Sequence, residues 1–212
     1  TVDSAIYVAH RRVESLAAMN ARDIVVTSVG RITDQKVRIL RQPMSSGRSA
    51  LDELLIELGD RGCLIMLGNG DAELERFLAG TAGRHANFIF IKGYSDPLSE
   101  ALYQSGDLFL MPSSFEPCGI SQMLSMRAGQ PCLVHGVGGL NDTVIDGVNG
   151  FSFHGETLDA QASNMLQRFR EALTLRKESP DQWAAISRSA AAERFLWSES
   201  VTRYIATLYQ SG

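Results

Sequence analysis

The sequence predicts an α/β domain built on a Rossmann-like, doubly wound parallel sheet. Short apolar runs alternate along the chain with segments of helical period, which is the pattern of repeated strand–helix units. Residues 24–29, Ile-Val-Val-Thr-Ser-Val, are rich in β-branched residues on consecutive positions, as expected of a strand buried on both faces. With 212 residues and 44% hydrophobic content, the chain is long enough for one sizeable core.

Six segments are predicted to be strands: 24–29, 63–67, 87–91, 108–111, 132–135 and a shorter one at 151–153. Between them, leucines at helical spacing over 51–58 predict one helix. A second stripe over 74–78 follows the capping residue Asp71, and Asp96-Pro97 marks another helix start. Right-handed crossovers would join the parallel strands.

After Phe153 the pattern is wholly helical, with apolar stripes over 158–173 and 197–208. We predict a helical segment at 1–22, the Rossmann-like domain at 23–194 and a closing helix at 195–212. The apolar stripe around Trp197 and Tyr204 is expected to be exposed and to offer a surface for self-association.

Composition narrows the function classes. A net charge of −4 gives no electrostatic argument for nucleic acid or an anionic membrane. No apolar stretch approaches the roughly 20 residues that span a bilayer, and the first residues do not resemble a secretory signal, so a soluble, cytoplasmic protein is expected. Three cysteines and four histidines show no metal spacing, so neither a metal nor another cofactor is expected. The glycines at 68–70 and 136–139 do not complete the G-x-G-x-x-G pattern of dinucleotide-binding loops, so a nicotinamide or flavin dehydrogenase is disfavoured.

The loop after the strand at 108–111 carries the most informative residues. Pro112 ends the strand, and a helix is expected to begin near Gly119, with Ile120, Met123 and Leu124 on one face. The first amides of that helix, at Gly119, Ile120 and Ser121, favour a phosphate group.

Glu116 precedes these amides. Its carboxylate repels phosphate but accepts hydrogen bonds from sugar hydroxyls. The alternative is that Glu116 only caps the helix and Cys118 fills a small apolar gap.

Two cations follow the first predicted strand. Arg31 and Lys36 leave from the sheet edge that also carries the Glu116 loop, where ligands of open α/β sheets bind. Arginine offers a planar fork to phosphate oxygens and lysine a point charge. Gly138 and Gly139 are expected to allow close backbone approach to the same ligand, with an ordinary tight turn as the alternative.

Five segments occur in order along the chain: 30–36, 67–71, 93–94, 107–122 and 138–144. Together they resemble the carboxyl-terminal half of bacterial glycogen synthases and plant starch synthases, which are retaining glycosyltransferases of the GT-B fold. Many broader group 1 enzymes carry a second glutamate eight positions after the first, whereas Leu124 stands there in this chain. The synthases also lack that glutamate and share Cys118 and Gln122.

The resemblance implies a role for each site residue. Arg31 and Lys36 would neutralise the departing diphosphate, and Glu116 would hold the glucose hydroxyls. The donor-binding residues would be Tyr94, in an adenine pocket, together with Cys118, Gly119, Ile120, Ser121, Gly138 and Gly139.

The implied activity is transfer of glucose from ADP-glucose to the non-reducing end of an α-1,4-glucan. In the family, the closing helix contacts an amino-terminal domain that also binds the glucan. The isolated chain is therefore expected to be inactive.

Two departures keep other functions open. Val37 replaces the family's usual glycine after the lysine, so the loop that presents Lys36 is expected to differ, as is the rest of 37–49. His135-Gly136-Val137 replaces the usual basic and threonine residues. The alternatives are a UDP-sugar-dependent retaining transferase of the broader group 1 family, using for example UDP-glucose, and a non-catalytic nucleotide-sugar-binding module.

Overall fold

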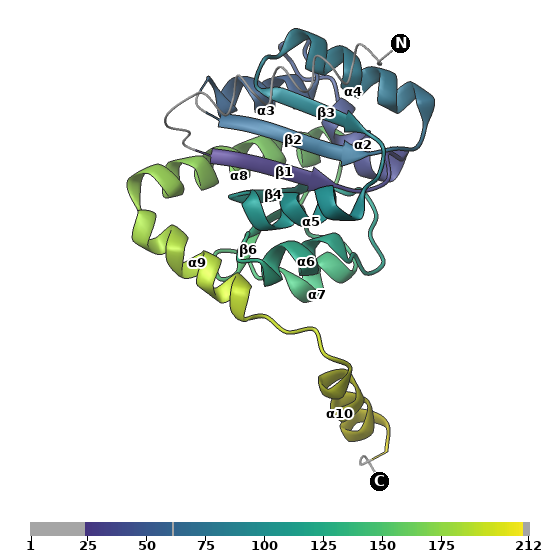
Figure 1. The fold of residues 1–212 in the computed structure, drawn as a ribbon, viewed down its shortest axis with the longest axis vertical. Coiled ribbons are helices and arrows are strands. Elements are labelled where there is room, and N and C mark those ends of the chain that lie inside the picture. The colour runs from purple at the N-terminus through teal and green to yellow at the C-terminus, as the bar shows by residue number, and fades with distance from the viewer. Residues whose placement is uncertain (1–23, 61, 210–212) are drawn as a thin grey trace.

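The computed structural model describes residues 24–60 and 62–209. Six parallel strands form one sheet in the order β3-β2-β1-β4-β5-β6 (Figure 1). Their bounds are β1 Ile24–Val29, β2 Gly62–Gly68, β3 Phe88–Lys92, β4 Leu108–Met111, β5 Cys132–His135 and β6 Gly150–Phe153. All six predicted strands are confirmed, with ends that move by no more than a residue.

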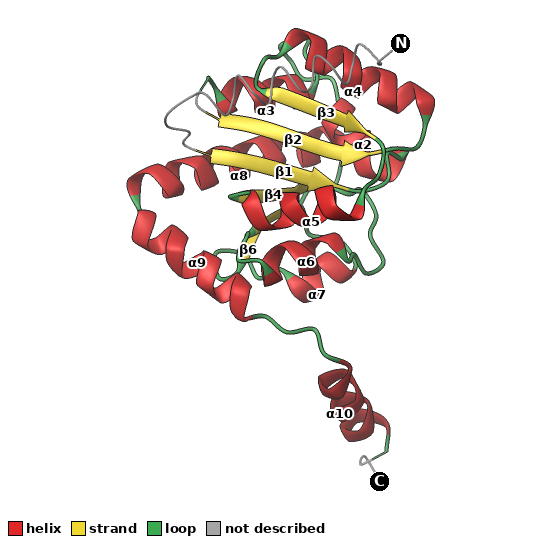
Figure 2. Ribbon diagram, in the orientation of Figure 1, coloured by secondary structure: helices red, strands yellow, loops and turns green. Residues whose placement is uncertain are grey.

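Helices cover both faces of the sheet (Figure 2). Leu108 and Leu110 of β4 join a core with helices α2, α3, α4 and α8, whereas Phe109 and Met111 join a second core with α5, α6 and α7. This alternation along one strand is the period of two that a doubly wound sheet requires. The helices are α2 Asp34–Arg41, α3 Ala50–Leu58, α4 Ala72–Arg84, α5 Asp96–Ser105, α6 Ser121–Arg127, α7 Gly139–Thr143, α8 Leu158–Glu178, α9 Pro180–Ala192 and α10 Trp197–Leu208.

The helix starts predicted from a capping residue and from a proline are confirmed. Asp71 caps α4 by accepting from the amides of Glu73 and Leu74, and proline stands in the first turn of α5. The stripe over 158–173 packs into the first core. Helix α9 was not among the predicted helices, and it buries Trp183, Ile186 and Ala190. None of the described helices is long and apolar enough to cross a lipid bilayer. The segment 1–22 lies outside the described residues.

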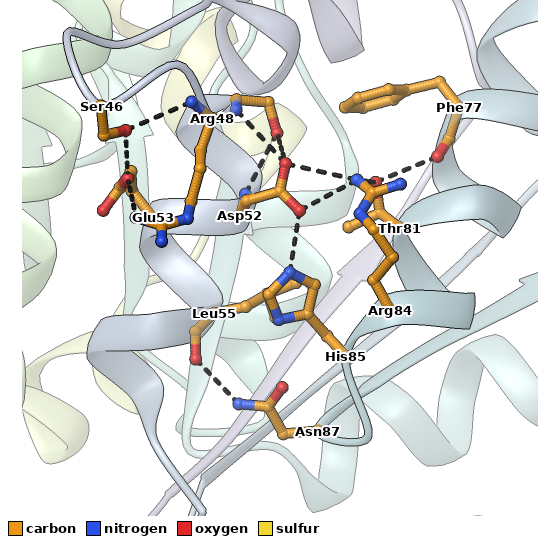
Figure 3. A network of polar contacts seen from close by, with 11 residues as sticks. Ser46, Arg48, Asp52, Glu53, Leu55, Phe77, Thr81, Arg84, His85 and Asn87 are labelled. Carbon is orange, nitrogen blue, oxygen red and sulfur yellow. Dashed lines mark hydrogen bonds and ion pairs between the residues drawn. The ribbon is translucent and has the colours of Figure 1, made fainter.

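A polar cluster joins the start of α3 to the end of α4 (Figure 3). Asp52 forms a capping box with Ser49, accepts from Arg84 at 2.9 Å and lies 2.8 Å from Nε2 of His85. Burial opposes ionisation of Asp52, but the hydrogen bonds from Ser49, Arg84 and His85 outweigh it and lower its pKa from 3.8 to about 2. One carboxylate therefore ties two helices together.

Asp52→Asn is expected to lower the free energy of unfolding at neutral pH by about 1 to 2 kcal/mol, less than the full pKa shift because Arg84 remains solvated. The folded-state pKa lies below the ordinary value, so this stability is present above pH 3.8 and is lost as the pH falls toward 2. Urea unfolding at several pH values measures it. Glu53→Gln, on the same helix but paired with Ser46 and Arg48 at the surface, is the control. Equal losses in both variants would contradict the assignment.

Helix α10 projects away from the body of the domain (Figure 1). Trp197 is 85% exposed and Tyr204 66% exposed, and Val201, Ile205 and Leu208 extend the same apolar stripe. The expected exposed patch is therefore confirmed. Its contact with an amino-terminal domain stays a prediction.

We propose that this stripe drives self-association of the chain as its concentration rises, because association removes apolar surface from water. Trp197→Ser combined with Tyr204→Ser is expected to shift the population toward monomer in sedimentation velocity. Thr202→Ala, on the same helix, should leave the distribution unchanged. If oligomers persist in the double variant, self-association does not depend on the apolar stripe of α10.

Candidate donor-binding site

The predicted site residues Arg31, Lys36 and Glu116 lie at the point between β1 and β4 where the strand order of the sheet changes direction. From β1 the chain builds outward to β2 and β3, then crosses back to place β4 on the other side of β1. Loops that leave the carboxyl ends of β1 and β4 therefore diverge around a crevice, the usual ligand position in such sheets. Arg31 and Lys36 follow β1, and Glu116 follows β4.

The central contact joins Lys36 to Glu116. Nζ of Lys36 donates to Oε2 of Glu116, although the residues stand 80 positions apart in the sequence. The side chain of Lys36 is 22% exposed and that of Glu116 is 11% exposed, so water screens the pair only partly. Ser113 adds a hydrogen bond of 3.3 Å from its hydroxyl to the same carboxylate oxygen.

Lys36 is presented by helix α2 and not by a loop, which corrects the sequence expectation. Val37 is fully buried in the first core, and none of the described residues other than glycine has a positive φ. Valine is therefore compatible with the backbone at this position. The amide of Ser114 donates to the carbonyl of Gln35 at 2.7 Å, which ties the Glu116 loop to α2.

His135 supports the same loop from β5. Its Nδ1 lies 2.9 Å from the carbonyl oxygen of Ser113, and its ring stacks on Phe153. Burial lowers the pKa of His135, although the hydrogen bond to Ser113 acts in the opposite direction. A neutral imidazole that donates from Nδ1 fits this arrangement.

Gly138 and Gly139 bring the start of α7 against the Glu116 loop. A Cβ at Gly138 would lie 2.0 Å from the carbonyl oxygen of Glu116, and one at Gly139 would lie 2.4 Å from that of Cys118. The amide of Gly139 donates to the Glu116 carbonyl at 3.1 Å. These glycines therefore allow close approach between two segments of the chain itself. Approach to a donor stays a prediction.

Helix α6 starts at Ser121, two residues later than expected, after Gly119 at φ 78°. Its buried face is formed by Gln122, Ser125 and Met126, whereas Ile120 and Leu124 are exposed. The apolar face that carries Ile120 and Leu124 is therefore not the buried face of α6, because the polar Gln122 takes a buried position instead.

The structure contradicts the two alternative roles considered for the loop, namely that Glu116 only caps α6 and that Cys118 fills an apolar gap. No side chain caps α6, so Glu116 does not serve as its cap, and Cys118 is exposed instead of filling an apolar gap. Gln122 holds the loop: its Nε2 lies 3.1 Å from the Cys118 carbonyl and 3.0 Å from that of Gly119, and 3.3 Å from Oγ1 of Thr143.

Arg31 and Tyr94 complete the edge of the site. Arg31 is exposed after β1, and Tyr94 is 68% exposed after β3. The hydroxyl of Tyr94 donates to Asp96, which raises the pKa of Tyr94. Burial raises the pKa of Tyr103 on α5, although the side chain of Ser121 at the start of α6 acts in the opposite direction.

The comparisons with known proteins agree with this geometry. Residues 18–189 match the family model described as glycosyl transferases group 1. Glycogen synthase from Desulfitobacterium hafniense is 36% identical over 202 residues, which cover 90% of this chain and 40% of that protein. Glycogen synthase from Aeromonas salmonicida is 38% identical over 148 residues, covering 66% of this chain and 30% of that protein.

Among solved structures, the catalytic domain of starch synthase IV from Arabidopsis thaliana, bound to ADP and acarbose, aligns with a TM-score of 0.73 and 26% identity, over 96% of this chain and 42% of that one. HepE from Anabaena in complex with UDP-glucose aligns with a TM-score of 0.65 at 22% identity, over 97% of this chain and 52% of that one, which shows the fold alone. The chain thus spans less than half the length of these synthases. It belongs to the group 1 glycosyl transferases, with the α/β sheet of a GT-B enzyme.

Proposed function

We propose that the chain is the donor-binding half of a retaining glycosyltransferase that moves glucose from ADP-glucose to the non-reducing end of an α-1,4-glucan. The Lys36–Glu116 contact carries the proposal. It puts a cation suited to diphosphate beside a carboxylate suited to sugar hydroxyls, at the edge of the sheet where ligands bind.

The preference for ADP rests on similarity. The starch synthase IV structure contains ADP and is above 25% identical to this chain. The glycogen synthase relatives are 36% and 38% identical. Tyr94 is exposed at the end of β3, where its ring is free to stack on a base.

The chemistry follows from the charges. The bond between the anomeric carbon and the diphosphate oxygen would break, the 4-hydroxyl oxygen of the glucan would bond the anomeric carbon on the same face of the sugar, and the hydroxyl proton would leave with the diphosphate. Arg31, Lys36 and the first amides of α6 would stabilise the negative charge on the departing diphosphate, each by up to about 3 kcal/mol. Glu116 would hold glucose hydroxyls and would not form a covalent intermediate.

Calorimetric titration with ADP-glucose, UDP-glucose and ADP tests the proposal. The expected order of affinity is ADP-glucose above ADP, because of the sugar contact with Glu116, and ADP-glucose above UDP-glucose. A preference for UDP-glucose would favour the broader group of UDP-sugar transferases. Equal binding of ADP and ADP-glucose would favour a non-catalytic nucleotide-binding module.

The isolated chain is proposed to bind donor without transferring it, because acceptor-side groups are expected in a further domain. Incubation with labelled ADP-glucose and maltotetraose measures this. Measurable glucan elongation would show that the described domain is sufficient for catalysis.

A further inference from the structure

A hollow of about 740 Å³ opens beside the donor-binding site, where β4, β5 and β6 end and α8 begins. Its lining includes Ser114, His135, Gly136, His154, Gln161 and Asn164.

The hollow lies beside the loop that carries Glu116, although Glu116 is not part of its described lining. Ser114 lines it, and the preceding residue, Ser113, donates to Glu116 and accepts from His135, which lines the hollow as well. Arg31 and Lys36 do not belong to its described lining. The hollow therefore reaches the Glu116 loop through Ser114 and His135, whereas none of its described lining comes from β1 or α2, the elements that precede Arg31 and carry Lys36.

The charge of the lining selects the type of ligand. The described lining contains the acid Glu156 and no lysine or arginine. A phosphate or another anion would find no permanent counter-charge there. Neutral hydrogen-bonding groups dominate, and these match a ligand rich in hydroxyls.

The hydrogen-bonding groups of the hollow are held in place. Gln161 donates through Nε2 to the carbonyl of Gly155 at 3.0 Å, and Asn164 donates through Nδ2 to that of His154 at 2.7 Å. These bonds fix both amides while their carbonyl oxygens can accept from ligand hydroxyls. A Cβ at Gly136 would lie 2.1 Å from Cε1 of His154, so glycine lets this imidazole lie against the exit of β5.

We propose that this hollow binds the terminal sugars of the α-glucan acceptor. The inference rests on the proposed function, which supplies a neutral, hydroxyl-rich second substrate that must reach the glucose held at Glu116. The donor half of the enzyme would thus contribute to acceptor binding through the connections that follow β5 and β6.

Nuclear magnetic resonance of the whole chain tests the inference, by following the side-chain amide signals of Gln161 and Asn164 during titration with maltotetraose. Both signals are expected to shift with saturation. Gln161→Leu should weaken the affinity by about fivefold, the loss of one neutral hydrogen bond. Gln167→Leu is the matched control, because Gln167 lies further along α8, outside the hollow, and bonds Glu171. Gly136→Ala is a second variant, which displaces His154 and should also weaken binding.

Separate titrations with ADP-glucose and inorganic phosphate distinguish the outcomes. If ADP-glucose binds and maltotetraose leaves both amides unmoved, the acceptor subsite is wrong and the donor function stands. If maltotetraose shifts both amides and ADP-glucose does not bind, the subsite stands and the donor function fails. Phosphate shifting the same amides, ADP-glucose displacing maltotetraose from them, or maltotetraose shifts confined to α10 would each overturn the subsite.

Discussion

Gly138→Ala is expected to lower the free energy of unfolding by about 3 to 5 kcal/mol, the sum of backbone strain and overpacking. Gly138 has φ 48° and ψ −134°, a conformation that residues with a side chain rarely adopt. Its new Cβ would also lie 2.0 Å from the carbonyl oxygen of Glu116. Since both atoms belong to the backbone or are attached to it directly, neither can turn away.

The matched control is Gly147→Ala. Gly147 also has a positive φ, of 72°, but a Cβ there would have no atom within 4 Å. The Gly147→Ala variant should therefore lose only the part of the free energy of unfolding that is due to backbone strain, about 1 kcal/mol. Urea unfolding of both variants separates strain from collision. If they lose the same stability, the Glu116 loop moves freely relative to α7.

Lys36→Ala is expected to weaken binding of ADP by about 10- to 100-fold, which corresponds to one charge-assisted hydrogen bond. Two effects add. The diphosphate loses a cation, and the carboxylate of Glu116, whose side chain is 11% exposed, is left without its partner beside the ligand. Arg38→Ala, on the same helix but paired only with Asp34 in the described structure, should bind ADP normally.

A double-mutant cycle separates those two effects. Glu116→Gln removes the repulsive carboxylate, so in the Lys36→Ala background it should restore about 1 kcal/mol of the lost ADP affinity. Glu116→Gln alone should retain ADP binding and abolish the extra affinity for ADP-glucose. Calorimetry of the four proteins gives the coupling energy. Additive changes would show that the two side chains do not act on one ligand.

The fold was predictable because its signals are local. Each strand is a short apolar run, and the caps of α4 and α5 lie next to the helices they start. The proximity of Lys36 and Glu116 was predictable as well, since both follow strands whose carboxyl ends share an edge. Their direct contact was not, because it depends on β1 and β4 being neighbours, which no local pattern records.

The residues that support the site escaped prediction for a different reason. Gln122 is fully buried although it is polar, so the apolar spacing of Ile120, Met123 and Leu124 does not reveal which face of α6 is buried. Ser113 also acts through hydrogen bonds, which have no sequence period. Helix α9 was missed because its stripe includes alanine, a weak hydrophobic signal. Gly138 was predicted to approach a donor, and that stays a prediction; the neighbour that the structure shows is the chain's own Glu116 loop.

The strand order also determines the order in which the strands are expected to pair during folding. β1, β2 and β3 are laid down consecutively, whereas β4 joins β1 only after a long excursion: the amide of Val25 bonds the carboxylate of Asp107, 82 residues later. Closing large loops slows the formation of such pairings. We expect pulse-labelled hydrogen exchange to protect β2 before β5. A chain emerging from the ribosome would then complete three of its six strands while one edge of β1 is still unpaired, and the proposed donor site would form only after the Glu116 loop had been synthesised.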